Sequence, residues 1–159
     1  MLDSANVFLQ KSEPVIHLLH SVLVSQLRDL LVRFVKPTAI LSCSKLHHVD
    51  FTSLCNHLED SELFVAHDAA EYISNCTQQL ALHQFYVSVR QFYVVACSYM
   101  VKRYPFDDEL LRNAAVANTA ERNKHVFASV KYFADRFQCG FSAVNRIRTV
   151  CWTNYSLNF

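Results

Sequence analysis

Glycine and proline are scarce in this chain, which has one glycine, Gly140, and three prolines among its 159 residues. Proteins built from many strands need tight turns, and tight turns rely on these two residues. Their scarcity therefore argues against an all-β fold and predicts a helical one. The single glycine also excludes glycine-rich phosphate loops and the nucleophile elbow of serine hydrolases, because each of these motifs needs more than one glycine.

Long apolar runs and secretion signals are also missing from the sequence. The best apolar run, residues 92–101, falls far short of the about 20 residues that a membrane-spanning helix needs. No apolar run with a basic lead-in follows Met1, and Asp3 comes early. We therefore expect an intracellular protein whose six cysteines are free thiols in a reducing compartment.

Charge is sparse and unevenly placed along the chain. Charged residues make up 18% of the sequence against 52% for hydrophobic residues, and the formal net charge is +1. Residues 1–80 carry 5 Lys/Arg and 9 Asp/Glu, whereas residues 81–159 carry 10 and 5. The basic second half predicts a surface for an anionic partner or, more ordinarily, two halves that complement each other in one fold.

Helical periodicity organises the chain around residues 80–104. Pro105 lacks an amide hydrogen and disfavours helical conformation at the residue before it, so this helix should end at Tyr104. A second long helix is predicted over 13–36, before Pro37, and we expect the two helices to pack as antiparallel rods. Tyr86, Tyr93, Val94 and Val101 lie outside the main apolar stripe of the 80–104 helix, so we expect this helix to be buried on more than one side. The main apolar stripe recurs at steps of three and four: Phe85, Val89, Phe92, Ala96 and Met100.

Shorter helices are predicted around this pair, giving an all-α fold with a single domain over 1–159. Residues 37–67 show no long period, so we interpret them as a connector with short helical turns that covers the long helices, briefly extended over 46–51. Asp107, Asp108 and Glu109 suit the start of a helix, where acids meet the positive end of the helix dipole. The short helices are expected at 4–11, 67–75, 106–115, 120–136 and 141–152.

A possible zinc site is suggested by a local group of cysteines and histidines: Cys43, His47, His48, Cys55 and His57. These residue types bind zinc, but a strong signal would be a paired C-x2-C with a second pair downstream. We therefore interpret them as ordinary connector residues, predict no metal or other cofactor, and rank a zinc or thiol enzyme last among the functions.

Basic residues with tyrosines among them make nucleic-acid binding an alternative function. Tyr99, Tyr104 and Tyr132 lie between the basic positions, and aromatic rings stack on bases. No recognised nucleic-acid motif accompanies them, so the first interpretation is a set of solvated faces. The candidate nucleic-acid-binding residues are Lys102, Arg103, Arg112, Arg122, Lys124 and Lys131.

Five short blocks of sequence carry a resemblance to a known family. The blocks are PVIHLLH at 14–20, RFVKP at 33–37, ELF at 62–64, VRQFY at 89–93 and YPFDDELL at 104–111. In this order they resemble hAT-type transposases, in particular the transposase-derived, BED-zinc-finger-associated proteins of animals. The resemblance spans about residues 8–138.

The resemblance implies a fragment of a larger protein. Such transposases have an RNase H-like core with three metal-binding carboxylates, interrupted by a long helical insertion. This chain resembles the stretch after the second carboxylate and into that insertion, so no catalytic residue is carried over. We therefore expect a non-catalytic module, in the nucleus by the same resemblance, that binds a protein partner: itself or a larger transposase-like protein. Apolar surface normally covered by the missing core would drive this association.

Overall fold

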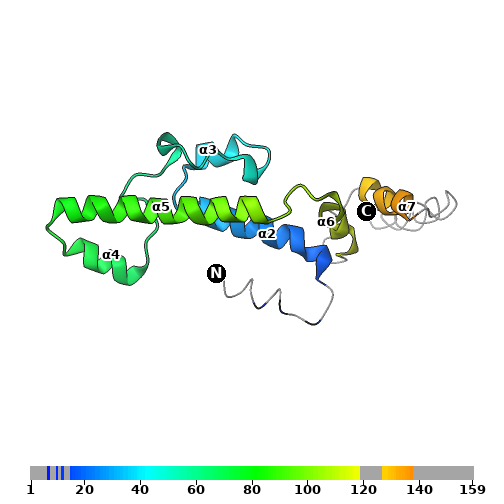
Figure 1. Ribbon diagram of the computed structural model, residues 1–159, viewed down its shortest axis with the longest axis horizontal. Helices are drawn as coiled ribbons and strands as arrows, with labels where there is room; N and C mark the ends of the chain where they lie inside the picture. Colours follow the sequence, from blue (N-terminus) through cyan, green and yellow to red (C-terminus); the bar gives the residue numbers. More distant parts are fainter. Residues whose placement is uncertain (1–6, 8–9, 11, 13–14, 119–126, 138–159) are drawn as a thin grey trace, which may run out of the picture. The chain divides into compact units, whose positions relative to one another are not determined.

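The computed structural model describes residues 7, 10, 12, 15–118 and 127–137. These residues are all-α, with one isolated antiparallel bridge between Val35 and His57. None of their helices is long and apolar enough to cross a membrane. The α-helices are α2 (Ile16–Leu31), α3 (Pro37–Leu41), α4 (His67–Ser74), α5 (Gln79–Arg103), α6 (Glu109–Ala114) and α7 (Phe127–Arg136), and the short 3₁₀ turns are Leu46–His48, Leu54–Asn56 and Ala115–Ala117 (Figure 1).

The chain divides into two compact units. Among the described residues, 22–106 form the first unit, and positions 7, 10, 12, 15–21, 107–118 and 127–137 belong to the second. The first unit holds α3, α4, α5 and most of the buried apolar side chains. Within it, α4 lies back along the first part of α5 as a helical hairpin (Figure 1).

Helix α5 lies within one residue of its predicted bounds at each end. The amide of Tyr104 donates to the Met100 carbonyl at 2.8 Å, and Tyr104 itself is extended, with φ −88° and ψ 137°. This is the conformation that the residue before a proline prefers, so Pro105 explains the stop. Lys102 and Arg103 occupy the last turn, where cations meet unpaired carbonyls.

The first long helix is shorter than predicted, because α2 ends at Leu31 and not at Lys36. Its predicted start at residues 13–14 lies outside the described residues. After Leu31 the chain makes turns and then becomes extended at Lys36, with φ −58° and ψ 137°. Tertiary hydrogen bonds explain the difference: the Lys36 amide donates to the Asn56 carbonyl, and the Leu58 amide donates to the Phe34 carbonyl, both at 2.8 Å.

The connector forms part of the core and is more than a cover over the helices. Its residues Val49, Phe51 and Leu63 are buried, as are Phe34 and Val35 just before it. Periodicity could not reveal this packing, because the connector is held by single bridges and turns. The brief extended stretch predicted at 46–51 is wrong in its first half, which is the 3₁₀ turn Leu46–His48.

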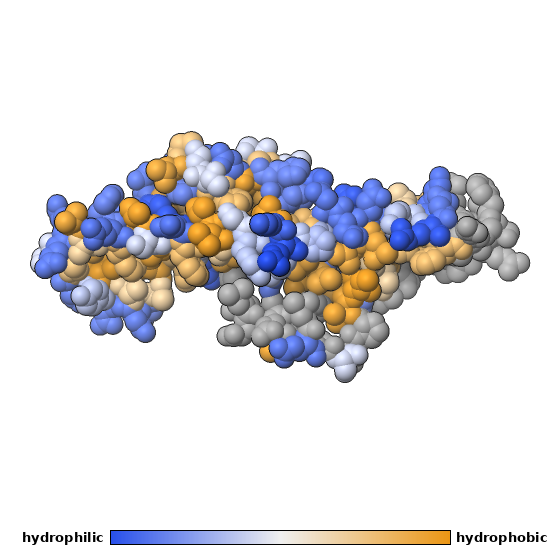
Figure 2. Space-filling model, in the orientation of Figure 1, coloured by the Kyte–Doolittle hydropathy of each residue, from blue (hydrophilic) through white to orange (hydrophobic). Residues whose placement is uncertain are grey.

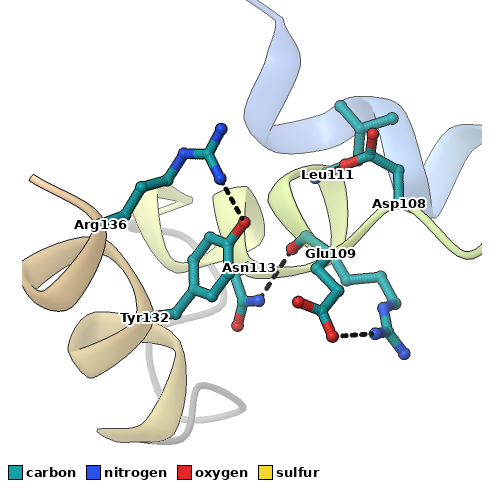
Figure 3. Close-up of polar contacts among 7 residues, drawn as sticks. Asp108, Glu109, Leu111, Asn113, Tyr132 and Arg136 are labelled. Carbon is teal, nitrogen blue, oxygen red and sulfur yellow. Dashed lines mark hydrogen bonds and ion pairs between the residues drawn. The ribbon is translucent and has the colours of Figure 1, made fainter.

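The short helices follow the prediction where the structure describes them. Helix α4 matches the predicted 67–75. Helix α6 is shorter than the predicted 106–115, and its N-cap is Asp108, whose Oδ1 accepts the Leu111 amide at 3.0 Å (Figure 3). Helix α7 accounts for the end of the predicted 120–136, and α6 packs against it. The buried residues of these two helices are Leu111, Ala114 and Ala134. The predicted helices at 4–11 and 141–152 fall outside the described residues, apart from positions 7 and 10.

Candidate interaction surface

Helix α5 is apolar on two sides, and only one of them is buried. Tyr93, Cys97 and Met100 are the buried residues of the inner side. The expected burial on more than one side is wrong at Phe92, which was placed in the buried stripe but is 65% exposed. Five large side chains project into solvent within about 140° of arc around the helix. They define what we call the outer face: Leu80, Val87, Phe92, Val95 and Tyr99.

The inner side is fixed by Tyr93. Its ring stacks on Phe34 with 5.4 Å between centroids and 9° between planes. Its hydroxyl donates a hydrogen bond to the Phe64 carbonyl at 3.0 Å. The Tyr93 side chain thus buries apolar area and also has a hydrogen-bonded hydroxyl. Both contacts hold α5 against the connector.

Arg90 provides the second attachment between α5 and the connector. Its guanidinium donates to the Leu58 carbonyl at 2.8 Å and forms an ion pair with Asp60 at 2.6 Å. Arg90 is also the only Asp, Glu, Lys or Arg residue between Gln79 and Val101. Because this charge turns toward Asp60, the outer face is left with uncharged polar neighbours. These neighbours are Gln84, Ser88, Gln91 and Ser98.

A shallow groove joins the outer face to α4. It has a volume of about 360 Å³, and its wall is mostly apolar. The guanidinium of Arg33 lies over the Phe64 ring at 4.1 Å, at one edge of the groove. Figure 2 shows apolar side chains gathered where α4 and α5 run together. The groove is lined by Phe64, Val65, Ala66, Ala69, Phe85, Ser88, Val89, Phe92 and Tyr93.

Cys97 is the most completely buried cysteine of the described residues. Burial without a charged neighbour raises the pKa of the Cys97 thiol to about 12. A thiol held in the neutral form is neither a nucleophile nor a metal ligand. Cys97 therefore serves packing.

The four weak zinc candidates do not form a ligand set. Among the described residues, no three of Cys43, His47, Cys55 and His57 have ligand atoms close enough to share one ion. The Cys43 thiol donates to the His48 carbonyl at 3.7 Å. Cys55 is exposed, and its Sγ lies 3.0 Å from the Ser53 hydroxyl. The His47 ring stacks on Phe106, with 5.2 Å between centroids.

His57 belongs to the core, which the sequence did not reveal. Its ring lies edge-on to Phe34 at 5.2 Å, and its Nε2 is 2.9 Å from the Phe51 carbonyl. Because the carbonyl only accepts, Nε2 carries the proton. Its Nδ1 is buried and has no hydrogen-bond partner among the residues described.

The turn beside His57 is held by Asp50. One Asp50 oxygen accepts from the Thr52 hydroxyl at 2.8 Å and from the amides of Thr52 and Ser53 at 3.2 Å. The bond from the Thr52 side chain is the main cause of a lowered Asp50 pKa, and the two amides lower this pKa further. The connector around the zinc candidates is thus organised by hydrogen bonds within the chain.

The six nucleic-acid candidates are distributed over both units. Lys102 and Arg103 are exposed at the end of α5, and the Arg103 guanidinium lies 5.4 Å from the centroid of the Tyr99 ring. In the second unit Arg112 pairs with Glu109 at 3.7 Å (Figure 3). Lys131 is exposed on α7. The remaining two, Arg122 and Lys124, lie outside the described residues.

Sequence reasoning missed the outer face for an identifiable reason. The residues of both sides of α5 recur at helical spacing, so periodicity alone marks the whole helix as core. A usable signal was present in the neutral polar residues Gln84, Gln91 and Ser98, which interrupt the outer side only.

Comparisons with known proteins do not place the chain in a family. A scan against protein-family models and searches of curated proteins and of solved structures found no match to this chain.

Proposed function

We propose that this chain is a protein interaction module without catalytic activity of its own, and that the outer face of α5 is its docking surface. The observation that carries the proposal is a row of five large exposed side chains along one helix with no charged residue among them. Single exposed apolar residues are common on protein surfaces, whereas several large apolar side chains gathered along one helix side, with only uncharged polar residues between them, favour a binding site.

The relative strength of the available contacts favours the outer face over the charged rim. Burying one side chain such as Phe92 or Val95 on a partner contributes about 1.5–3 kcal/mol. An exposed ion pair made by Lys102 or Arg103 would add only about 0–1 kcal/mol. The apolar strip therefore supplies most of the binding free energy, and the neighbouring charges select the partner.

We also propose that the chain derives from an hAT-type transposase, acts in the nucleus, and keeps α2 and α5 as an antiparallel pair. The support is the order of the five sequence blocks. Two of these blocks, 62–64 and 89–93, meet in space, because the Tyr93 hydroxyl donates to the Phe64 carbonyl. Stacking of Phe34, just beyond α2, on Tyr93 supports the helix pairing.

The docking role is tested by photo-cross-linking in cells. A benzophenone amino acid placed at Val95 should give protein adducts of higher mass. The matched control places it at Leu41, which is 81% exposed but lies on the short helix α3. Two results would rule out a specific surface. One is adducts at Val95 that persist when Val87→Ser is added, and the other is adducts that form equally well at Leu41. Absence of any adduct at Val95 would reject the function.

A second candidate function is weak, sequence-nonspecific nucleic-acid binding through the basic C-terminal half. The observation in its favour is the exposed pair of Tyr99 and Arg103, beside Lys102 in the same turns of α5. A ring and a guanidinium can stack on bases while the ammonium neutralises phosphate. Binding to fluorescent single-stranded DNA should then weaken steeply with salt and fall with Lys102→Gln and Arg103→Gln. No binding at low salt would exclude this role.

A further inference from the structure

Tyr72 on α4 is the most exposed tyrosine of the described residues, with 76% of its surface accessible. Two hollows open beside its ring. One lies toward the start of α5, against Ala81 and Leu82, and the other lies along Asp68 and Glu71. The phenol of Tyr72 is therefore accessible to another protein and contributes little to the packing of the fold.

The sequence around Tyr72 is acidic. Glu71 directly precedes it and Asp68 lies about one helical turn before it, and both side chains are exposed. Neither carboxylate forms an ion pair within the part of the chain that the structure describes. The sequence has no Lys or Arg from position 46 to position 89. An enzyme that approaches Tyr72 along the chain therefore meets negative charge alone.

Helix α4 is held weakly in the fold. It has 8 residues, none of them is buried, and its N-cap, Ala66, supplies no side-chain hydrogen bond. An isolated helix of this length is marginal in water, so α4 depends on packing that is slight here. Local unfolding of such an element costs little, and it would let Tyr72 enter the extended substrate cleft of an enzyme.

We propose that Tyr72 is a phosphorylation site for an ATP-dependent tyrosine kinase whose substrate cleft is basic. Cations of the cleft pair with Asp68 and Glu71, which selects this tyrosine and places its phenol at ATP. The Tyr72 Oη forms a bond to the γ-phosphorus, and the bond from this phosphorus to the oxygen that bridges to the β-phosphate breaks. ADP leaves with that electron pair, and the phenolic proton passes to the catalytic carboxylate of the kinase.

The phosphate would unfold α4. It carries a charge of about −2 at pH 7, and the Tyr72 side chain leans toward the start of the helix, over Asp68. Like charges at this spacing destabilise a helix, and the last turn of α4 has no base to offset them. Ala66 and Ala69 form the α4 wall of the groove beside the outer face, so phosphorylation removes that wall. This last consequence, control of docking, rests on the proposed function.

The test incubates the purified full chain with ATP and a tyrosine kinase domain that prefers acidic residues before its target, and locates phosphate by mass spectrometry. Tyr72→Phe should remove most of the phosphate. The matched control is Tyr99→Phe, which should change nothing, because Tyr99 is 59% exposed but lies beside Arg103. Asp68→Asn with Glu71→Gln should lower kcat/KM for Tyr72 about tenfold or more. No phosphate on Tyr72, or more on Tyr99 than on Tyr72, overturns the proposal.

The effect on α4 is measured by hydrogen exchange of the phosphorylated and unphosphorylated chains. Amides of α4 should exchange about tenfold faster or more after phosphorylation, whereas those of α5 around Tyr93 should not change. Equal protection of α4 in the two forms overturns its unfolding. The docking function fails separately: phosphate on Tyr72 stands even if Val95 gives no adduct, and adducts at Val95 stand even if Tyr72 is not phosphorylated.

Discussion

The two sides of α5 are made from similar residues and have opposite environments. The inner side buries Tyr93 and Cys97, while the outer side leaves Phe92 and Val95 in solvent. The difference comes from polar attachments, because Arg90 and Tyr93 both bond to carbonyls of the connector. Apolar composition makes either side capable of burial, and a few directional hydrogen bonds decide which side enters the core.

The largest expected effect comes from deleting the ring on which the inner side packs. Phe34→Ala should lower the free energy of unfolding by about 3–5 kcal/mol, because it removes a fully buried ring and leaves a cavity. Phe92→Ala removes an identical ring from the outer side and should change it by less than about 0.5 kcal/mol. Urea unfolding followed by circular dichroism measures both. Equal losses would mean that the two sides do not differ in packing.

A smaller effect is expected from the polar attachment alone. Tyr93→Phe keeps the stacked ring but leaves the Phe64 carbonyl without its donor, which should cost about 1–2 kcal/mol. Tyr99→Phe, the same change on the exposed side, should be neutral. If Tyr93→Phe were also neutral in urea unfolding, the hydroxyl bond would not be what fixes the inner side.

Alkaline pH should lower the free energy of unfolding, because Cys97 is buried on the inner side. Burial raises the pKa of this thiol from its ordinary 9.0 to about 12, so the folded state favours the proton more than the unfolded state does. The stabilisation is complete below pH 9 and is lost as pH rises from 9 toward 12, at up to about 1.4 kcal/mol per pH unit.

The matching measurement compares wild type and Cys97→Ala by urea unfolding at a series of pH values. The difference between them should shrink above pH 9. A thiol reagent at pH 8 offers a direct readout, in which exposed Cys55 reacts in the native chain and Cys97 only after unfolding. Rapid reaction of Cys97 in the folded chain would contradict its burial.

The smallest effect concerns the turn beside the core. The Asp50 pKa is lowered, so its bonds stabilise the fold above the ordinary pKa of 3.8 and are lost as pH falls below it. Asp50→Ala should therefore give a small loss of stability at neutral pH that shrinks as pH falls below 3.8, measured by thermal unfolding at pH 7 and pH 3. An undiminished loss at pH 3 would point to a cause other than the carboxylate.

Helix positions could be predicted from the sequence, whereas tertiary attachments could not. Pro105 located the end of α5, and the acids at 107–109 indicated the start of a helix, at which the structure shows Asp108 as the N-cap. The end of α2 was misplaced because the hydrogen bonds that stop it come from residues 56–58, which lie far along the chain. The residues near the end of a helix do not show which distant residues will form hydrogen bonds with them.

The same limit applies to the candidate surface. Phe92 has the spacing of a core residue, and only the orientation of α5 shows that it is exposed. That orientation depends on the ion pair of Arg90 with Asp60 and on the hydrogen bond from Tyr93 to the Phe64 carbonyl. In each case the two partners are about 30 residues apart in sequence. Periodicity therefore identified the helix but not the side that faces solvent.

Arg90 and Tyr93 lie about one helical turn apart and bind two separate carbonyls of the connector. Two such hydrogen bonds on one helix prevent it from rotating about its long axis, since any rotation would break both bonds together. The outer face therefore keeps a constant rotational phase before any partner arrives. A partner docks on a surface that is already oriented, so association needs no rearrangement of α5 and proceeds at the ordinary rate for a rigid patch.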